Sequence, residues 1–210
     1  MTRSRPVRQG EIAPDFTLPA VLEPRDVALA DHRGKSAVLL GLFRGLHCPF
    51  CRRQIVQLST IEDRLAGMGI ATVAVVNTRR ERAALYFRHQ PPRVTLLADP
   101  DARVHRLFGV PEIALDAAFE AARINPTGEL AAPTPPMEAN FALNARDGFA
   151  MTPVDEEIIA AHGAQLAAHF LIDRDGVVRW TTVEAAEGPQ HIGAFPSPSE
   201  ILQVARLVAT

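Results

Sequence analysis

Two cysteines, Cys48 and Cys51, constrain the fold most, because they are the only cysteines of the chain and lie three positions apart after an apolar run. A disulfide between them closes a loop too small to stabilise a fold. A structural zinc site usually takes four ligands, and no second cysteine pair follows, although seven scattered histidines remain as alternative ligands. The spacing therefore favours a redox-active dithiol, with no metal and no cofactor.

The segments around the dithiol predict a strand followed by a helix. Ala37–Phe43 is continuously apolar between two glycines, which is typical of a strand buried on both faces of a sheet. From Pro49 onward apolar residues recur every three or four positions, which predicts an amphipathic helix ending near Gly67 or Gly69. Pro49 then occupies the first helical turn, where its missing N–H costs nothing.

The rest of the chain continues the alternation of strands and helices. Ile70–Val76 and Val94–Ala98 are predicted strands, the second of them a third central strand. Arg79–His89, Asp101–Phe108 and Ser199–Val208 are predicted helices. His169–Asp173 and Val177–Val183 flank an Asp-Gly turn and predict a hairpin. A C-x-x-C motif beside such a pattern indicates a thioredoxin-like α/β fold, with a central mixed sheet flanked by helices.

The segment Val110–Ala164 does not fit this alternation. Ile113–Ala122 and Val154–His162 have helical patterns, and the prolines between them indicate a long loop. Loops of this length in a compact domain are usually lids, interface elements or mobile segments, and the sequence does not choose among these. We expect one thioredoxin-like domain over residues 1–210, with an insertion at about 110–164 before the last two strands.

Composition narrows the classes of partner and the location. The chain has 22 basic and 24 acidic residues, a net charge of −2, so no long-range field attracts nucleic acid or an anionic membrane. The amino terminus lacks the apolar run of a signal peptide, and no stretch approaches the ~20 apolar residues of a membrane span. We expect a cytoplasmic protein whose partners are small molecules or other proteins.

The position of the dithiol suggests its chemistry. A cysteine at a helix start faces unpaired backbone N–H groups and the positive end of the helix dipole, which favour the thiolate, and a second thiol one turn on resolves a mixed disulfide. Pro49 stiffens the turn, and Phe50 either receives substrate or packs against the insertion. Arg44 and His47 lie in the turn before the thiols and are candidate supporting residues. Arg52 and Arg53 are close enough in sequence to stabilise the thiolate, but exposure on a solvated helix face explains them equally well.

Three ordered motifs resemble the alkyl hydroperoxide reductase and thiol-specific antioxidant (AhpC/TSA) family, the peroxiredoxin branch of the thioredoxin superfamily. They are A-P-D-F-T-L-P at Ala13–Pro19, F-R-G-L-H-C-P-F-C-R around the dithiol, and F-L-I-D-R-D-G at Phe170–Gly176. More narrowly, the chain is similar to peroxiredoxin-like proteins with R-G-x-W-C-P-F-C, with His47 in place of their tryptophan. The resemblance implies a thioredoxin fold, a nucleophilic thiol at the helix start, and reduction of peroxides or disulfides.

The chain departs from the family pattern P-x-x-x-T-x-x-C. If the peroxidatic cysteine is Cys51, Cys48 falls at the threonine position and Arg44 at the proline position. The second arginine of the family would fall on Ala167. Thioredoxins instead place the attacking thiol first, which corresponds to Cys48, but their cis-proline has no counterpart in Leu166–His169.

We therefore expect a thiol-dependent peroxidase that cycles between dithiol and disulfide, with Cys48 attacking and Arg44 holding the peroxide oxygens. The alternatives are a disulfide reductase or oxidant without peroxidase activity and, less favoured, a non-enzymatic redox sensor or scaffold. The expected partners are a peroxide or disulfide substrate and an external thiol reductant such as thioredoxin or glutathione. We expect no nucleic acid and no membrane, and homodimer formation stays open.

Overall fold

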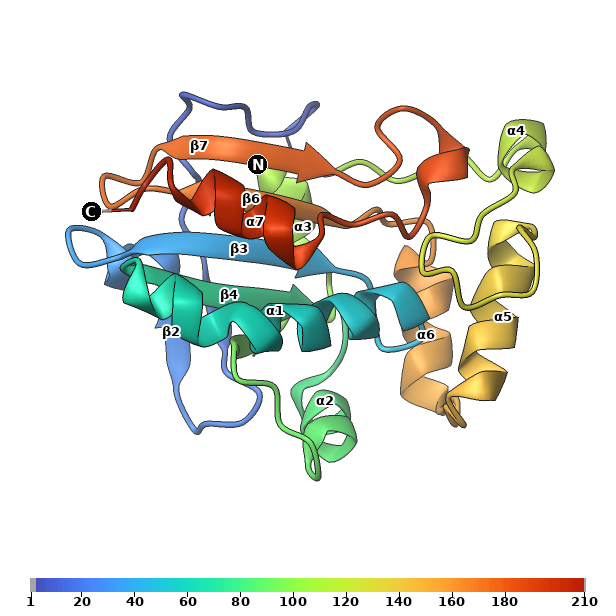
Figure 1. The fold of residues 1–210 in the computed structure, drawn as a ribbon. Coiled ribbons are helices and arrows are strands. Elements are labelled where there is room, and N and C mark those ends of the chain that lie inside the picture. Colours follow the sequence, from blue (N-terminus) through green and yellow to red (C-terminus); the bar gives the residue numbers. More distant parts are fainter. Residues whose placement is uncertain (1–2, 210) are drawn as a thin grey trace.

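The computed structural model describes residues 3–209, which form an α/β fold around a five-stranded mixed sheet (Figure 1). The strands in spatial order are β5 (Thr95–Ala98), β4 (Ile70–Val76), β3 (Ala37–Phe43), β6 (Ala168–Ile172) and β7 (Val178–Val183). The first three strands are mutually parallel, and β6 and β7 are antiparallel to their neighbours. The thioredoxin-like mixed sheet expected from the sequence is confirmed.

The central strand β3 separates two layers of the core. Leu39 and Phe43 pack on one face with apolar residues of α1 (Pro49–Gly67) and α7 (Pro198–Ala205). The alternate residues Leu40 and Leu42 pack on the other face with residues of α3 (Arg103–Phe108). Every residue of β3 is buried, which explains its uninterrupted apolar sequence. Figure 1 shows α1 and α7 in front of the sheet and α3 behind it.

The elements around the dithiol follow the sequence pattern closely. β3 and β4 have the predicted bounds, and α1 runs from Pro49 to Gly67 as expected. The predicted helices near 79–89, 101–108 and 199–208 are α2 (Arg80–Phe87), α3 and α7. The Asp-Gly hairpin is formed by β6 and β7.

The strand predicted at Val94–Ala98 forms, but its predicted central position in the sheet was wrong. β5 lies at the edge of the sheet and pairs only with β4 among the named strands, because β6 takes the other side of β3. An amino-terminal hairpin, β1 (Thr17–Pro19) and β2 (Asp26–Ala28), was not expected, and the short 3-10 turn η1 (Leu29–His32) follows it. Ala20, just after β1, bridges to Leu97 and so covers the outer edge of β5.

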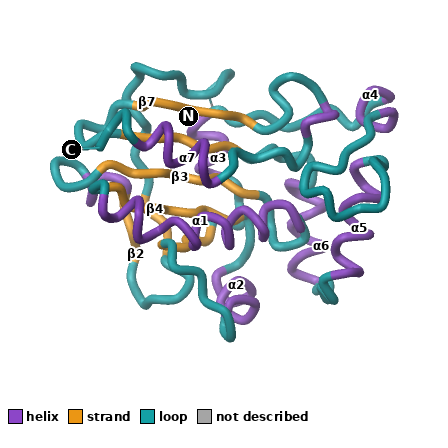
Figure 2. Tube along the Cα trace, in the orientation of Figure 1, coloured by secondary structure: helices purple, strands orange, loops and turns teal. Residues whose placement is uncertain are grey.

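The segment 110–164 lies at the end of the sheet where α1 begins (Figure 1). It contains α4 (Ala117–Ala121), α5 (Pro136–Arg146) and α6 (Pro153–His162), joined by the loops visible in Figure 2. The helix predicted over 113–122 is shorter in the structure, because Asp116 is the N-cap of α4 and the helix therefore begins at Ala117. α5 was missed because its proline-rich start looked like a loop, whereas Pro136 begins the helix.

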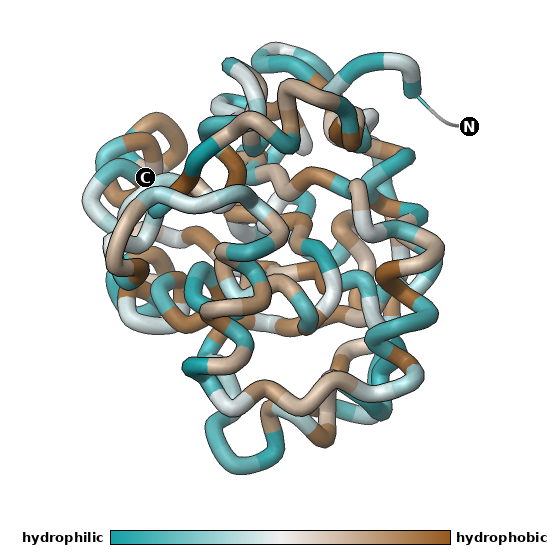
Figure 3. Tube along the Cα trace, turned by 90° about the vertical axis from the view of Figure 1, so that its right-hand side faces the viewer, coloured by the Kyte–Doolittle hydropathy of each residue, from teal (hydrophilic) through white to brown (hydrophobic). Residues whose placement is uncertain are grey.

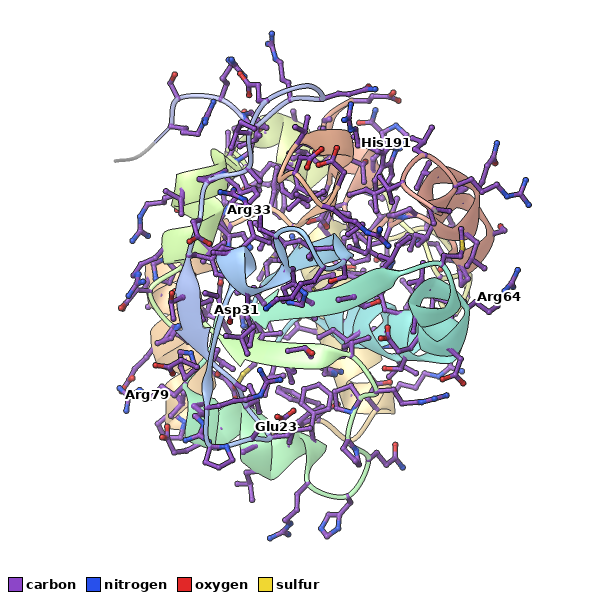
Figure 4. The ribbon with its side chains drawn as sticks, turned by 90° about the vertical axis from the view of Figure 1, so that its left-hand side faces the viewer. Glu23, Asp31, Arg33, Arg64, Arg79 and His191 are labelled. Carbon is purple, nitrogen blue, oxygen red and sulfur yellow. The ribbon has the colours of Figure 1, made fainter. Side chains whose placement is uncertain are left out.

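The opposite end of the molecule carries charges of both signs (Figure 4). Asp31 and Arg64 are exposed there, whereas Arg79, also labelled in Figure 4, pairs with Glu157 of α6 at 2.5 Å. A second 3-10 turn, η2 (Pro189–His191), carries the exposed His191. Across residues 3–209, no helix has both the length and the apolar character that crossing a membrane requires.

Candidate active site

The first turn of α1 brings the two cysteines together. β3 ends at Phe43, and four residues turn the chain into α1, for which Cys48 is the N-cap and Pro49 the first helical residue. The backbone N–H of Cys51 donates to Cys48 Sγ at 3.2 Å, as expected for an N-cap acceptor. Both cysteines are free and buried, with exposed fractions of 0% and 1%.

Arg44 provides the positive charge next to Cys48. Its Nη2 lies 3.4 Å from Cys48 Sγ. The same guanidinium makes a bidentate pair with Glu184, at 2.8 Å from Nη1 and 2.7 Å from Nη2. Arg44 is buried, and although burial alone would lower its pKa, the Cys48 thiolate and the Glu184 carboxylate hold that pKa well above the ordinary value. A fork geometry of this kind fixes the guanidinium plane relative to the sulfur.

Glu184 anchors this arrangement, and the sequence analysis missed it. It follows β7 directly, and its side chain is fully buried. Besides Arg44 it accepts hydrogen bonds from the backbone N–H of Ala167, at 2.9 Å, and of Gly193, at 2.6 Å. A single glutamate after a strand carries no motif, so only its unusual burial and its partners show that it belongs to the site. Ala167, the position where the resemblance placed a second arginine, contributes a backbone donor.

The surroundings of the two thiols shift their pKa values in opposite directions. Burial alone would raise the pKa of Cys48, but the hydrogen bond from Cys51 and the charge of Arg44 outweigh it and lower the pKa from 9.0 to about 6. Burial and the hydrogen bond to Cys48 raise the pKa of Cys51 well above its ordinary value. At neutral pH the pair therefore consists of a Cys48 thiolate and a Cys51 thiol that donates to it.

His47 is buried beside the thiolate, with 6% of its surface exposed. Burial, followed by the charge of Arg44, lowers its pKa to about 4, so the imidazole is neutral at pH 7. Its backbone oxygen accepts a hydrogen bond from Nδ2 of Asn144 in α5, at 2.9 Å. The turn before Cys48 is thus held by the segment 110–164.

Arg52 and Arg53 bind the same segment. Arg52 is buried, donates to the Leu46 oxygen at 2.6 Å and to Asp147 at 2.5 Å, and stacks over Phe149 at 4.4 Å. Arg53 pairs with Glu129 at 2.6 Å and with Asp147 at 2.8 Å. The solvated face considered for both residues is wrong for Arg52, because its guanidinium is enclosed by α5 and the loop after it.

A cavity of about 400 Å³ opens beside the dithiol. Arg44, His47 and Phe50, from the turn and helix start that carry the dithiol, line part of it. Its walls are mostly apolar side chains of the segment 110–164, among them Leu115, Phe119, Met137, Phe141, Met151 and Ile159. Figure 3 views the molecule from this end. A small apolar molecule in this cavity would meet the residues that surround Cys48.

Phe50 forms part of the cover over the dithiol. It is 2% exposed, and its ring packs against Gly193 so closely that a Cβ there would lie 2.7 Å from Cγ of the ring. Phe50 therefore packs against the loop after β7, and it also lines the cavity together with residues of the insertion, which the sequence analysis considered as its partner. Within residues 3–209, no three His, Cys, Asp or Glu side chains are grouped as metal ligands.

The fold and the site define a thioredoxin-like protein with a thiolate and a partner thiol at the start of one helix. The family model described as "AhpC/TSA family" matches residues 9–181, and the chain belongs to this family. The match includes both cysteines and Arg44, and ends before Glu184. The family resemblance drawn from the motifs is confirmed.

Similarity to individual proteins agrees with this family. The chain is 30% identical over 105 residues to the peroxiredoxin Bcp of Escherichia coli (strain K12), a stretch that covers 50% of this chain and 66% of that protein. The peroxidoxin BcpB of Mycobacterium tuberculosis shares the fold with a TM-score of 0.59 at 16% identity, over 96% of this chain and 98% of that one. The reduced 2-Cys peroxiredoxin of Plasmodium vivax shares the fold with a TM-score of 0.62 at 18% identity, over 96% of this chain and 81% of that one.

Proposed function

We propose that the chain is a thiol-dependent peroxidase in which Cys48 attacks the peroxide and Cys51 resolves the product. One observation carries the proposal: Cys48 Sγ lies between the guanidinium of Arg44 and the N–H of Cys51, with its pKa lowered to about 6. A thiolate is the nucleophile in peroxide reduction. Membership of the AhpC/TSA family and similarity to a Bcp peroxiredoxin support the same activity.

The proposed cycle has three balanced steps. The Cys48 thiolate attacks the terminal oxygen of a hydroperoxide, so an S–O bond forms, the O–O bond breaks and an alkoxide or hydroxide leaves. The Cys51 thiol then attacks the Cys48 sulfenic acid, which forms the disulfide and releases water. Two electrons from an external dithiol, or from two thiols, restore the reduced pair. Arg44 is the residue that would contact the attacked oxygen, since one Nη2 hydrogen already faces the sulfur.

Access to the dithiol imposes conditions on the substrates. A peroxide is small enough to approach through the cavity beside Arg44 and His47. A thiol reductant such as thioredoxin or glutathione would need Phe50, or the Gly193 loop packed on it, to move, because both sulfurs are covered. We propose that residues 1–210 act as one thioredoxin-like domain, in the cytoplasm, without a requirement for nucleic acid or membrane. Association into a homodimer belongs to the same proposal.

The test compares three proteins in single-turnover oxidation by hydrogen peroxide and cumene hydroperoxide. Wild type should consume both peroxides and form the disulfide. Cys51→Ser should react once and accumulate a sulfenic acid on Cys48 that dimedone traps, whereas Cys48→Ser should not react. Retention of turnover by Cys48→Ser, or dimedone labelling confined to Cys51, would contradict the assignment of the attacking thiol.

A second candidate is a disulfide reductase that uses the same thiols. Its supporting observation is the pair itself, a thiolate at the helix start with a protonated partner three residues on, which suits attack on a disulfide and resolution of the mixed species. Insulin reduction driven by dithiothreitol, in a protein that leaves peroxides unchanged, would favour this second function.

A further inference from the structure

His47 occupies a position that the proposed function has not yet used. It directly precedes Cys48 and lines the cavity together with Arg44 and Phe50, with only 6% of its surface exposed. Its Nδ1 is buried and, in the part of the chain that the structure describes, has no hydrogen-bond partner. Nδ1 lies against Gly45, where a Cβ would come within 2.9 Å of it, so it is not the nitrogen that a molecule in the cavity would contact.

Arg44 has few donors left for a second oxygen. Its Nη1 bonds to Glu184 at 2.8 Å and to the Gln165 oxygen at 3.4 Å, while its Nη2 bonds to Glu184 at 2.7 Å and to Cys48 at 3.4 Å. A guanidinium carries two hydrogens on each Nη, so all four have partners. The hydrogen that faces Cys48 suits the attacked oxygen, which bonds to sulfur. The oxygen that leaves needs a different donor.

The charges around His47 keep it neutral. The groups that act on it are Arg44 from the same turn, Arg52 from α1 and Asp155 from α6, and burial has the largest effect. With its pKa at about 4, the imidazole carries one N–H and no charge at pH 7. A neutral histidine serves as a hydrogen-bond donor to developing negative charge without losing its proton.

We propose that His47 is a catalytic residue that donates its imidazole N–H to the leaving oxygen when Cys48 attacks a hydroperoxide. This inference rests on the proposed peroxidase function. As the Cys48 S–O bond forms and the O–O bond breaks, the leaving alkoxide or hydroxide takes a hydrogen bond from His47, and water then supplies the proton that completes the alcohol or water molecule. In a cavity with mostly apolar walls, one such donor has a large effect on the rate, because few other groups there can stabilise the oxyanion.

The leaving group provides the test. An alkyl hydroperoxide releases a strongly basic alkoxide, whereas a peracid releases a weakly basic carboxylate that needs little stabilisation. Stopped-flow oxidation of Cys48 by cumene hydroperoxide and by peracetic acid is compared in wild type, His47→Phe, which lacks a donor, and His47→Gln, which retains one. His89→Phe, an exposed substitution beyond α2, is the matched control.

We expect His47→Phe to slow the reaction with cumene hydroperoxide about 100-fold and the reaction with peracetic acid much less. His47→Gln should recover most of the loss, and the pH midpoint of Cys48 alkylation should stay the same in both variants. Equal slowing with both oxidants, or no slowing, would overturn the role of His47 while the peroxidase function stands. Failure of wild type to react with either oxidant would overturn the proposed function and this inference together.

Discussion

Two arginine clusters flank the first turn of α1, and they differ in what their charge acts on. On one side, Arg44 pairs with the fully buried Glu184 and contacts Cys48 Sγ. On the other side, Arg52 and Arg53 pair with Asp147 and Glu129 and hold the segment 110–164 against the helix. All three arginines lie within ten residues of one another in sequence. Sequence position alone therefore does not show that Arg44 acts on the thiol, whereas Arg52 and Arg53 join the segment 110–164 to α1.

The difference follows from geometry. Arg44 begins the turn after β3, and its buried guanidinium contacts a sulfur and a carboxylate directly. Arg52 and Arg53 lie beyond the N-cap of α1, and their side chains bind α5 and the loops next to it. If this distinction is right, the first cluster controls the thiolate and the second controls the attachment of the segment 110–164.

Replacement of Arg44 should have the largest effect. Arg44→Met leaves the buried Glu184 carboxylate without its partner, so the free energy of unfolding should fall by about 3–5 kcal/mol. The pKa of Cys48 should rise, because the charge of Arg44 lowers it. Urea unfolding measures the first change, and the pH dependence of iodoacetamide alkylation measures the second. The double variant Arg44→Met, Glu184→Leu should recover part of the stability without restoring the low pKa. An unchanged alkylation midpoint in Arg44→Met would remove the basis of the comparison.

Replacement of Arg52 should affect stability and leave the thiol unchanged. Arg52→Ala removes hydrogen bonds to the Leu46 oxygen and to Asn144, and the stacking on Phe149. The expected loss is about 2–3 kcal/mol in the free energy of unfolding, together with faster hydrogen exchange in α5. Alkylation of Cys48 should keep its wild-type midpoint. A shift of that midpoint as large as the one in Arg44→Met would show that the two clusters act together.

The sequence predicts the parts of this fold whose pattern is local. β3, β4 and α1 have a continuous apolar run or a 3.6-residue period bounded by glycine or proline, and they form as expected. The edge position of β5 depends on which strands insert beside β3, which no local pattern contains. α5 begins within a cluster of prolines, and the helical first turn that Pro136 permits was not distinguished from a loop.

The site shows the same limit. Cys48, Cys51, Arg44, His47 and Pro49 are adjacent along the chain, so the sequence brings them together, although their roles stay predictions. Glu184 is 140 positions from Arg44, and its importance arises only when β6 pairs with β3 and β7 pairs with β6. A contact that depends on sheet order cannot be derived from spacing.

The pH dependence of stability should distinguish the thiolate from the structural pairs. In the folded state the pKa of Cys48 lies at about 6, below its ordinary value of 9.0, so between these values the unfolded chain binds more protons. The contribution of Cys48 is therefore fully present above pH 9 and is lost as the pH falls towards 6, with a slope of up to about 1.4 kcal/mol per pH unit. The raised pKa of Cys51 opposes this trend only above pH 9.

Cys48→Ser provides the control for this measurement, which follows urea unfolding under a reductant from pH 5.5 to 8.5. Wild type should gain stability relative to Cys48→Ser as the pH rises through the window. Parallel curves for the two proteins would mean that no thiolate is held in the folded state.

Replacement of Arg53 should have the smallest effect. Its side chain is about one fifth exposed, and its pairs with Glu129 and Asp147 lie at the surface of the joint between α1 and the segment 110–164. Water and salt screen such pairs, so Arg53→Gln should lower the free energy of unfolding by only about 0.5–1 kcal/mol. The loss should shrink further in 1 M sodium chloride, where the Debye length is about 3 Å. The loss in Arg52→Ala should persist in the same salt, because that guanidinium is enclosed. Equal salt sensitivity of the two variants would mean that solvent reaches the joint, and the segment 110–164 would then be held less firmly than the contacts of Arg52 indicate.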